Sequence, residues 1–92
     1  MDASFWTEKQ IEEWLVSETR TLVMPDGSLF PLTNFHMTWV LYDDLIENWG
    51  YAPQQFVTWA AEETKLHNIT FEAAFRSIVA FVDNHVRSLR QR

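Results

Sequence analysis

The fold of this chain is decided by the stretch from Trp39 to His85, which reads WVLYDDLIENWGYAPQQFVTWAAEETKLHNITFEAAFRSIVAFVDNH. Its apolar residues recur at steps of three and four, the period of an α-helix. Two short segments interrupt this pattern. In them, Gly50 can take the positive φ that ends a helix, Pro53 fits a first helical turn, and Thr70 can cap a helix start. The stretch therefore predicts three consecutive helices.

We expect these helices over residues 34–49, 53–66 and 70–90. Apolar residues cover nearly half the circumference of the last one, which is more than one neighbouring helix can cover. This helix is therefore either central in the domain or shared between two copies of the chain. Together with an aromatic content of 15%, the width predicts a homodimer. The residues expected at its interface are Phe71, Phe75, Ile78, Val82 and His85.

The residues before this core predict one more helix and a β-hairpin. Residues 7–19 begin with a capping box and carry a narrow apolar stripe, so we expect a helix that docks onto the rest. Two apolar runs, 21–24 and 28–32, then flank a Pro-Asp-Gly tripeptide that favours a tight turn. They predict a short hairpin. Because Pro31 has no amide donor, the second strand must lie at a sheet edge or end there.

The expected fold is mainly α, with four helices and one short β-hairpin or ribbon strand before the second helix. A length of 92 residues indicates a single domain, 1–92. Within it we expect an N-terminal docking helix at 1–20, the hairpin at 21–33 and a three-helix core at 34–90.

Composition limits the classes of function. The chain has no cysteine, which excludes disulfides, thiolate metal ligands and thiol catalysis. No apolar run approaches the roughly 20 residues of a membrane helix, and the N-terminus lacks the basic and apolar regions of a secretory signal. We therefore expect a cytoplasmic protein that does not act at a membrane.

Charge is unevenly distributed along the chain. Residues 1–64 hold eleven acidic and two basic side chains, residues 65–92 hold two acidic and five basic ones, and the net charge is −6. A negative overall field opposes non-specific binding to nucleic acid. The basic residues nearest the C-terminus suit either the negative end of a helix dipole or contact with phosphate. They are Arg87, Arg90 and Arg92.

Few residues suggest catalysis or metal binding. His36, Asp43 and Glu47 share one helical face, but His36 and Asp43 lie two turns apart, whereas metal ligands on one helix lie three or four residues apart. A solvated polar face explains them. His85 lies in an apolar stripe, either as a hydrogen-bonded packing histidine or as an interface histidine whose protonation below neutral pH would loosen a dimer. We expect no enzyme, no cofactor and no small-molecule substrate.

One pattern over residues 28–86 resembles a known family. A short strand leads into a helix with Trp39, a turn at Gly50, a second helix, and then Ala74-Phe75-Arg76 followed by apolar residues. This order resembles the ribbon-helix-helix class, in particular its bacterial subgroup with an additional C-terminal helix that begins near an asparagine, here Asn68.

The resemblance implies an intertwined homodimer in which paired strands form a two-stranded ribbon that reads DNA. The residues that it places on DNA are Ser28, Phe30 and Leu32 in the ribbon, Tyr51, Ala52 and Gln54 as a phosphate clamp at a helix start, and Arg87, Arg90 and Arg92 near the C-terminus. The ribbon departs from the family because it has no Arg, Lys, Asn or Gln, the side chains best suited to base edges. Pro31 also interrupts its pairing.

Three functions follow from these patterns. The first is a small non-enzymatic, ribbon-helix-helix-like dimeric regulator that binds DNA. The alternative is an acidic interaction module, an adaptor or inhibitor, that binds another protein and has lost DNA reading. The third, far behind, is a metal-dependent enzyme that uses His36, Asp43, Glu47 or His85.

Overall fold

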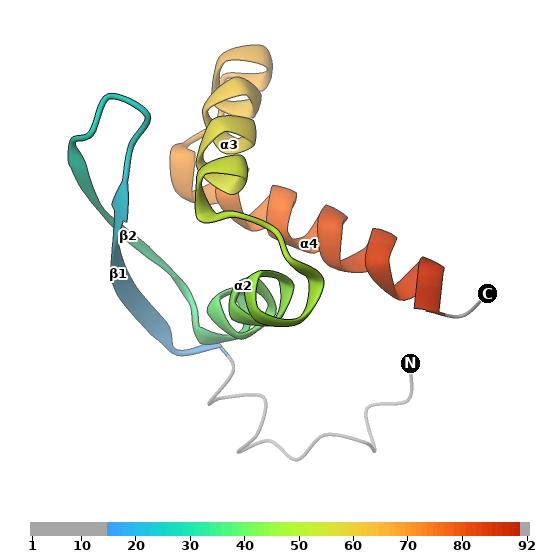
Figure 1. The fold of residues 1–92 in the computed structure, drawn as a ribbon. Helices are drawn as coiled ribbons and strands as arrows, with labels where there is room; N and C mark the ends of the chain where they lie inside the picture. Colours follow the sequence, from blue (N-terminus) through green and yellow to red (C-terminus); the bar gives the residue numbers. More distant parts are fainter. Residues whose placement is uncertain (1–14, 91–92) are drawn as a thin grey trace.

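The structure, a computed structural model, describes residues 15–90 as a β-hairpin followed by three helices (Figure 1). The elements are β1 (Ser17–Val23), β2 (Leu29–Phe35), α2 (His36–Trp49), α3 (Pro53–His67) and α4 (Phe71–Arg90). The long helix α4 contacts β2, α2 and α3. In Figure 1 the hairpin stands on one side of α2 and α3, and the C-terminal half of α4 extends away on the other side.

The hairpin lies where the Pro-Asp-Gly turn predicted it, and it is longer than expected. β1 and β2 pair antiparallel over seven residues each. Gly27 in the turn has a φ of 85°, the left-handed conformation that the turn requires. Pro31 lies opposite Thr21 inside β2 and does not end it. The position is compatible with proline because each strand of a two-stranded sheet has one open edge.

The helix boundaries follow the residues that predicted them. Gly50, with φ 76°, ends α2 in the left-handed conformation, and Asn68, with φ 52°, does the same for α3. Pro53 opens α3. The hydroxyl of Thr70 accepts a hydrogen bond of 3.2 Å from the Ala73 N–H at the start of α4. The three helices expected in the core are confirmed.

The substitution Gly50→Ala is expected to lower the free energy of unfolding by about 1 kcal/mol, because alanine disfavours positive φ. A Cβ atom at this position would meet no heavy atom within 4 Å, so the loss comes from the backbone and not from a clash. The opposite change, Asn68→Gly, should not lower the free energy of unfolding, because Asn68 has a φ of 52° and glycine adopts positive φ readily. Urea unfolding of both variants measures the difference. Wild-type stability in Gly50→Ala would contradict the left-handed assignment.

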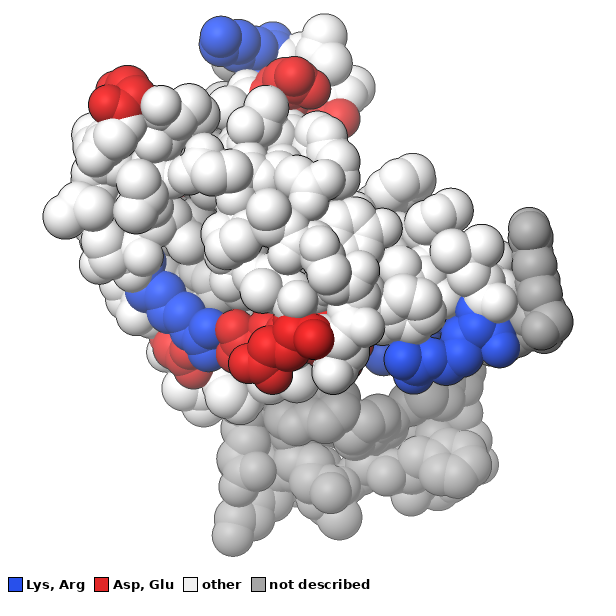
Figure 2. Space-filling model, viewed as in Figure 1, with Lys and Arg blue, Asp and Glu red and all other residues white. Residues whose placement is uncertain are grey.

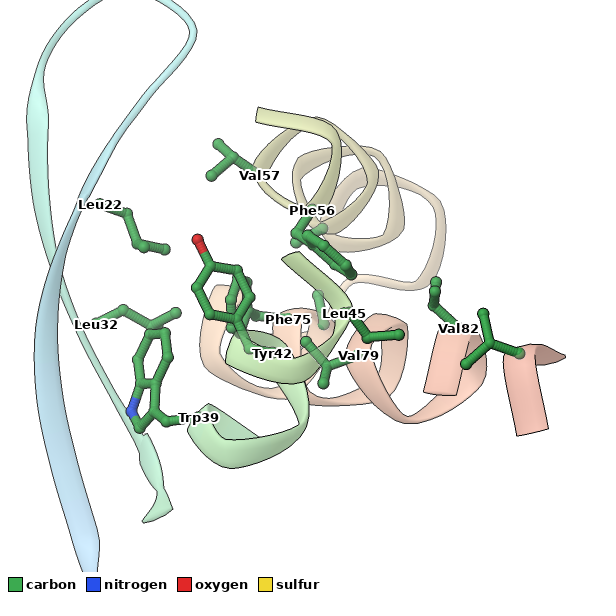
Figure 3. Packing of buried hydrophobic residues seen from close by; sticks show 13 residues of the cluster. Leu22, Leu32, Trp39, Tyr42, Leu45, Phe56, Val57, Phe75, Val79 and Val82 are labelled. Carbon is green, nitrogen blue, oxygen red and sulfur yellow. The ribbon is translucent and has the colours of Figure 1, made fainter. Parts of the chain in front are cut away.

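An aromatic cluster forms the centre of the core (Figure 3). Trp39 and Tyr42 of α2 lie 5.3 and 5.4 Å from Phe75 of α4, measured between ring centroids. Tyr42 also lies 5.4 Å from Phe56 of α3, and Leu32 of β2 packs on the hairpin side of the cluster. Much of the wide apolar face of α4 is thus covered by α2, α3 and β2 of the same chain, whereas Phe81 and Leu89 stay exposed. This coverage accounts for much of the width on which the expected homodimer rested.

The expected number of helices is wrong. Residues 15–90 hold three helices and not four, and residues 17–19, expected at the end of an N-terminal helix, form the start of β1. These strand residues are held by pairing with β2 and by the contact of Glu18 with His36 of α2, which outweigh their local helical pattern. Residues 7–14 of that expected helix lie outside the described part. The hairpin expected from the Pro-Asp-Gly turn is present, with β1 and β2 paired antiparallel within the chain.

None of the helices α2, α3 and α4 is both long and apolar enough to cross a membrane.

Candidate protein-docking surface

The hairpin turns two of the three ribbon residues expected on DNA toward the core. Exposure alternates along both strands, and Leu32 on the inner face is fully buried. Phe30, on the same face, packs edge-on against Phe71 of α4, with 5.2 Å between ring centroids. Ser28 lies in the turn and is exposed. The face of the hairpin that remains open carries no charged residue.

The expected phosphate clamp at the start of α3 is occupied by contacts within the chain. The Tyr51 ring packs against Phe56, with 5.7 Å between centroids. The Gln54 side-chain amide donates a 2.7 Å hydrogen bond to the backbone carbonyl of Val23. The Ala52 N–H donates to the side-chain oxygen of Gln55 at 2.7 Å. This helix start therefore anchors the hairpin tip and caps itself.

The basic end of α4 is also engaged within the chain. Arg87 Nε lies 2.8 Å from Asp83 Oδ2, and the Arg90 guanidinium lies 4.9 Å from the centre of the Trp49 ring. With Asp44, these residues line a hollow of about 300 Å³ between α2 and α4. Two carboxylates balance two guanidinium groups there, so this hollow has no net charge to attract phosphate. Arg92 lies outside the described residues.

The residues considered for metal binding belong to an ion-pair network that joins the hairpin to α2. Asp43 accepts two hydrogen bonds from the Arg20 guanidinium, at 2.6 and 3.0 Å. Arg20 Nε donates to Glu18 at 2.6 Å, and His36 Nδ1 lies 2.8 Å from the other Glu18 oxygen. Glu47 is exposed and takes no part. Residues 15–90 contain no group of three or more His, Cys, Asp or Glu side chains placed to hold a metal ion.

Electrostatics and an aromatic contact reinforce this network. The hydrogen bonds from His36 and then from Arg20 lower the pKa of Glu18, and the hydrogen bonds to Asp43 raise the pKa of Arg20. The Arg20 guanidinium lies 5.0 Å from the centre of the Trp39 ring. The network is half exposed, so we interpret it as a connection between elements and not as a reactive site.

The lowered pKa of Glu18 predicts how stability depends on pH. A carboxylate whose pKa is lower in the folded state stabilises the fold above its ordinary value of 4.5, and this contribution disappears as the pH falls through the folded value. The free energy of unfolding should therefore fall less steeply in Glu18→Gln than in the wild type below about pH 4.5. Urea unfolding across this range measures both slopes. Equal slopes would contradict the network.

A second kind of surface lies between α3 and α4, away from all of these residues. We call it the α3–α4 groove, a hollow of about 220 Å³. Its lining combines apolar and acidic side chains from the two helices: Trp59, Glu62, Glu63, Ile78, Phe81 and Val82. Phe81 is 72% exposed, whereas Val82 beside it is 6% exposed and belongs to the core. The groove therefore combines a large exposed aromatic side chain with a buried apolar one.

Acidic and basic side chains both lie near this groove. Figure 2 shows a basic side chain beside acidic ones at the end of α3, further acidic side chains low on the molecule, and basic ones along the far end of α4, with a broad face between the hairpin and α3 that has neither. Within the described residues, Glu63 forms an ion pair with His67 at 3.2 Å. Within residues 15–90, no Lys or Arg forms an ion pair with Glu62 or Glu63.

The five residues expected at a dimer interface divide between core and surface. Phe75 and Val82 lie in the core of the single chain, and Phe71 and Ile78 pack half-buried against it. His85 is exposed. Only the surface members of this set, and not Phe75, can meet another molecule.

Sequence reasoning did not single out the groove. Phe81 falls within the apolar stripe of α4 and Trp59 at the margin of the stripe of α3, so the helical period alone predicts that both pack inward. Phe81 and His85 lie four residues apart along one edge of the α4 stripe, and both are exposed. A stripe this wide is the one sequence signal that points to an uncovered face. Another apolar hollow, of about 170 Å³ between α2 and α4, borders Leu15, where the description begins. The α3–α4 groove is lined entirely by described residues.

In outline, a two-stranded antiparallel sheet followed by helices loosely resembles the ribbon-helix-helix arrangement. Comparison of the chain with known proteins finds no matching family model, no matching curated protein and no matching solved structure.

Proposed function

We propose that this protein is a non-enzymatic interaction module that binds another protein through the α3–α4 groove. The observation that carries the proposal is Phe81, 72% exposed in a groove whose two carboxylates form no ion pair with a Lys or Arg of residues 15–90. Interfaces are enriched in aromatic side chains that fill desolvated pockets and are surrounded by polar residues. Covering one such ring contributes about 2 kcal/mol to binding.

The contacts of the residues expected on DNA support this choice over DNA binding. Leu32 is buried, Gln54 and Arg87 hold other parts of the chain, and residues 15–90 carry nine acidic against five basic side chains. A protein of this charge is repelled by a polyanion. A fold can be kept when the function of its relatives is lost, and we propose that here a ribbon-helix-helix-like arrangement carries a protein-docking surface.

DNA binding is the second candidate, and one observation favours it. The open face of the hairpin carries exposed hydroxyls, among them Thr19 and Thr33, whose oxygens lie 2.7 Å apart, and Thr21 one register step away. Hydroxyls are common donors to DNA phosphates. A gel-shift assay with the gene's upstream DNA tests this candidate. Retardation at low salt that Thr21→Val weakens would favour it over the docking module.

The proposed function is tested by capture from the native host with three tagged proteins: the wild type, Phe81→Asp, and the control Leu66→Asp. Leu66 lies at the end of α3, is 75% exposed and does not line the groove. We expect the same discrete protein to be captured by the wild type and by Leu66→Asp but not by Phe81→Asp. Capture that is insensitive to Phe81→Asp, or recovery of DNA alone, would overturn the proposal.

A further inference from the structure

We infer that the occupant of the α3–α4 groove is a basic amphipathic helix of another protein, with apolar residues against Phe81 and a Lys or Arg between Glu62 and Glu63. This inference rests on the proposed function and specifies the partner's chemistry. It follows from three features of the described surface. They are the apolar stripe along α4, the acidic side chains at the edge of the groove, and the intramolecular contacts that most of the chain's own Lys and Arg residues make.

The apolar stripe has the length of a helical contact. From the groove, Ile78 and Phe81 continue along α4 to His85 and Leu89, which are exposed, Leu89 by 43%. Steps of three and four residues keep these side chains on one face of α4. At 1.5 Å per residue the stripe spans about 16 Å, or three helical turns. A short amphipathic helix that lies along α4 matches this length, as in helix-in-groove recognition.

The edge of the groove selects a cation. Glu62 and Glu63 stand on α3 beside the hollow, and Glu63 forms an ion pair with His67 within the described residues. The ring of Trp59 lines the same hollow. Carboxylates and the face of an indole ring both attract ammonium and guanidinium groups. A Lys or Arg that enters here meets two attractive groups at once, whereas an acidic residue meets two repelling ones.

A second copy of this chain fits the groove poorly. Of the five cations in residues 15–90, Arg20 and Arg87 form ion pairs, and Arg76 and Arg90 lie over aromatic rings. Lys65 is the remaining one. Two copies of a chain with a net charge of −6 also repel each other. Since four of the five cations in residues 15–90 are engaged within their own chain, we assign the complementary charge to another protein.

Selection from a library of helical peptides tests the inference. The probe is a display library of three-turn helices with leucine on one face and Lys, Glu or Ser randomised at the flanking positions. It is selected on the wild type and counter-selected on Phe81→Asp. We expect the surviving peptides to be enriched in Lys over Glu. We also expect the double variant Glu62→Gln/Glu63→Gln to bind them about tenfold more weakly, and the control Glu47→Gln to bind them as the wild type does, because Glu47 lies on α2 outside the groove.

The other outcomes separate this inference from the proposed function. Peptides that depend on Phe81 but show no Lys enrichment, or that bind the double variant equally well, would overturn the basic partner and leave groove docking in place. Absence of any peptide that depends on Phe81 would overturn both. Sedimentation that shows a dimer of the wild type, and a monomer of Phe81→Asp, would identify a second copy as the occupant and overturn the inference.

Discussion

Trp39→Ala is expected to lower the free energy of unfolding by about 4 kcal/mol, a large part of the 5 to 15 kcal/mol typical of a single domain. Trp39 is fully buried at the junction of three elements. Its ring packs against Tyr42 and Phe75, and its indole N–H donates to the Glu18 backbone carbonyl at 2.8 Å. Alanine would leave a cavity and remove the donor to that carbonyl.

Two variants separate the contributions of the Trp39 side chain. Trp39→Phe keeps an aromatic ring and removes the donor, so we expect a loss of about 2 kcal/mol. Leu66→Ala removes an exposed side chain and should change the stability by less than about 0.5 kcal/mol. Urea unfolding followed by circular dichroism measures all three. If Trp39→Ala were as stable as Leu66→Ala, the contact between the hairpin and α2 would be assigned wrongly.

Phe81→Asp is expected to weaken partner binding by at least about 100-fold, since truncation of a central aromatic residue typically costs 2 kcal/mol or more. The aspartate adds a charge beside Glu62 and Glu63, which repels a basic partner further. Because Phe81 is 72% exposed, the folded state should keep its stability within about 0.5 kcal/mol. Titration of the captured partner with the purified variant measures the affinity.

The control for this variant is Leu66→Asp, which adds the same charge at a similarly exposed apolar residue on α3. We expect its affinity for the partner to match that of the wild type. Equal losses in Phe81→Asp and Leu66→Asp would show that net charge, and not the groove, controls binding. Loss of helical circular dichroism in Phe81→Asp would assign its effect to the fold.

The core helices were predictable because their ends carry local signals. Gly50, Pro53 and Thr70 act through their own backbone or hydroxyl group, and the structure places each at the expected helix end. The start of β1 was not predictable in this way. Its inward positions hold Glu18 and Arg20 where a strand pattern should show apolar residues. Arg20 is tolerated there because it pairs with a carboxylate 23 residues away, a contact that no local pattern contains.

The site was less predictable than the fold, because it depends on which faces remain uncovered. Phe30 and Leu32 lie two residues apart, as expected for two side chains on one face of a strand. This spacing does not tell which face packs against the helices. Their face packs inward because Leu22 and Leu32 join the core. For Phe81 the sequence pattern predicts burial, but the side chain is exposed. It fits the apolar stripe of α4, but the stripe is wider than its neighbours cover, and the excess lies at the groove.

The most direct test of groove docking is site-specific photo-crosslinking in the native host. An aromatic photo-crosslinking residue is placed at position 81, where it keeps a ring in the groove, and in a separate protein at position 66, which is equally exposed outside it. Groove docking predicts one discrete protein adduct from position 81 and none from position 66. Adducts of the same intensity from both positions, or no protein adduct from position 81, would contradict it.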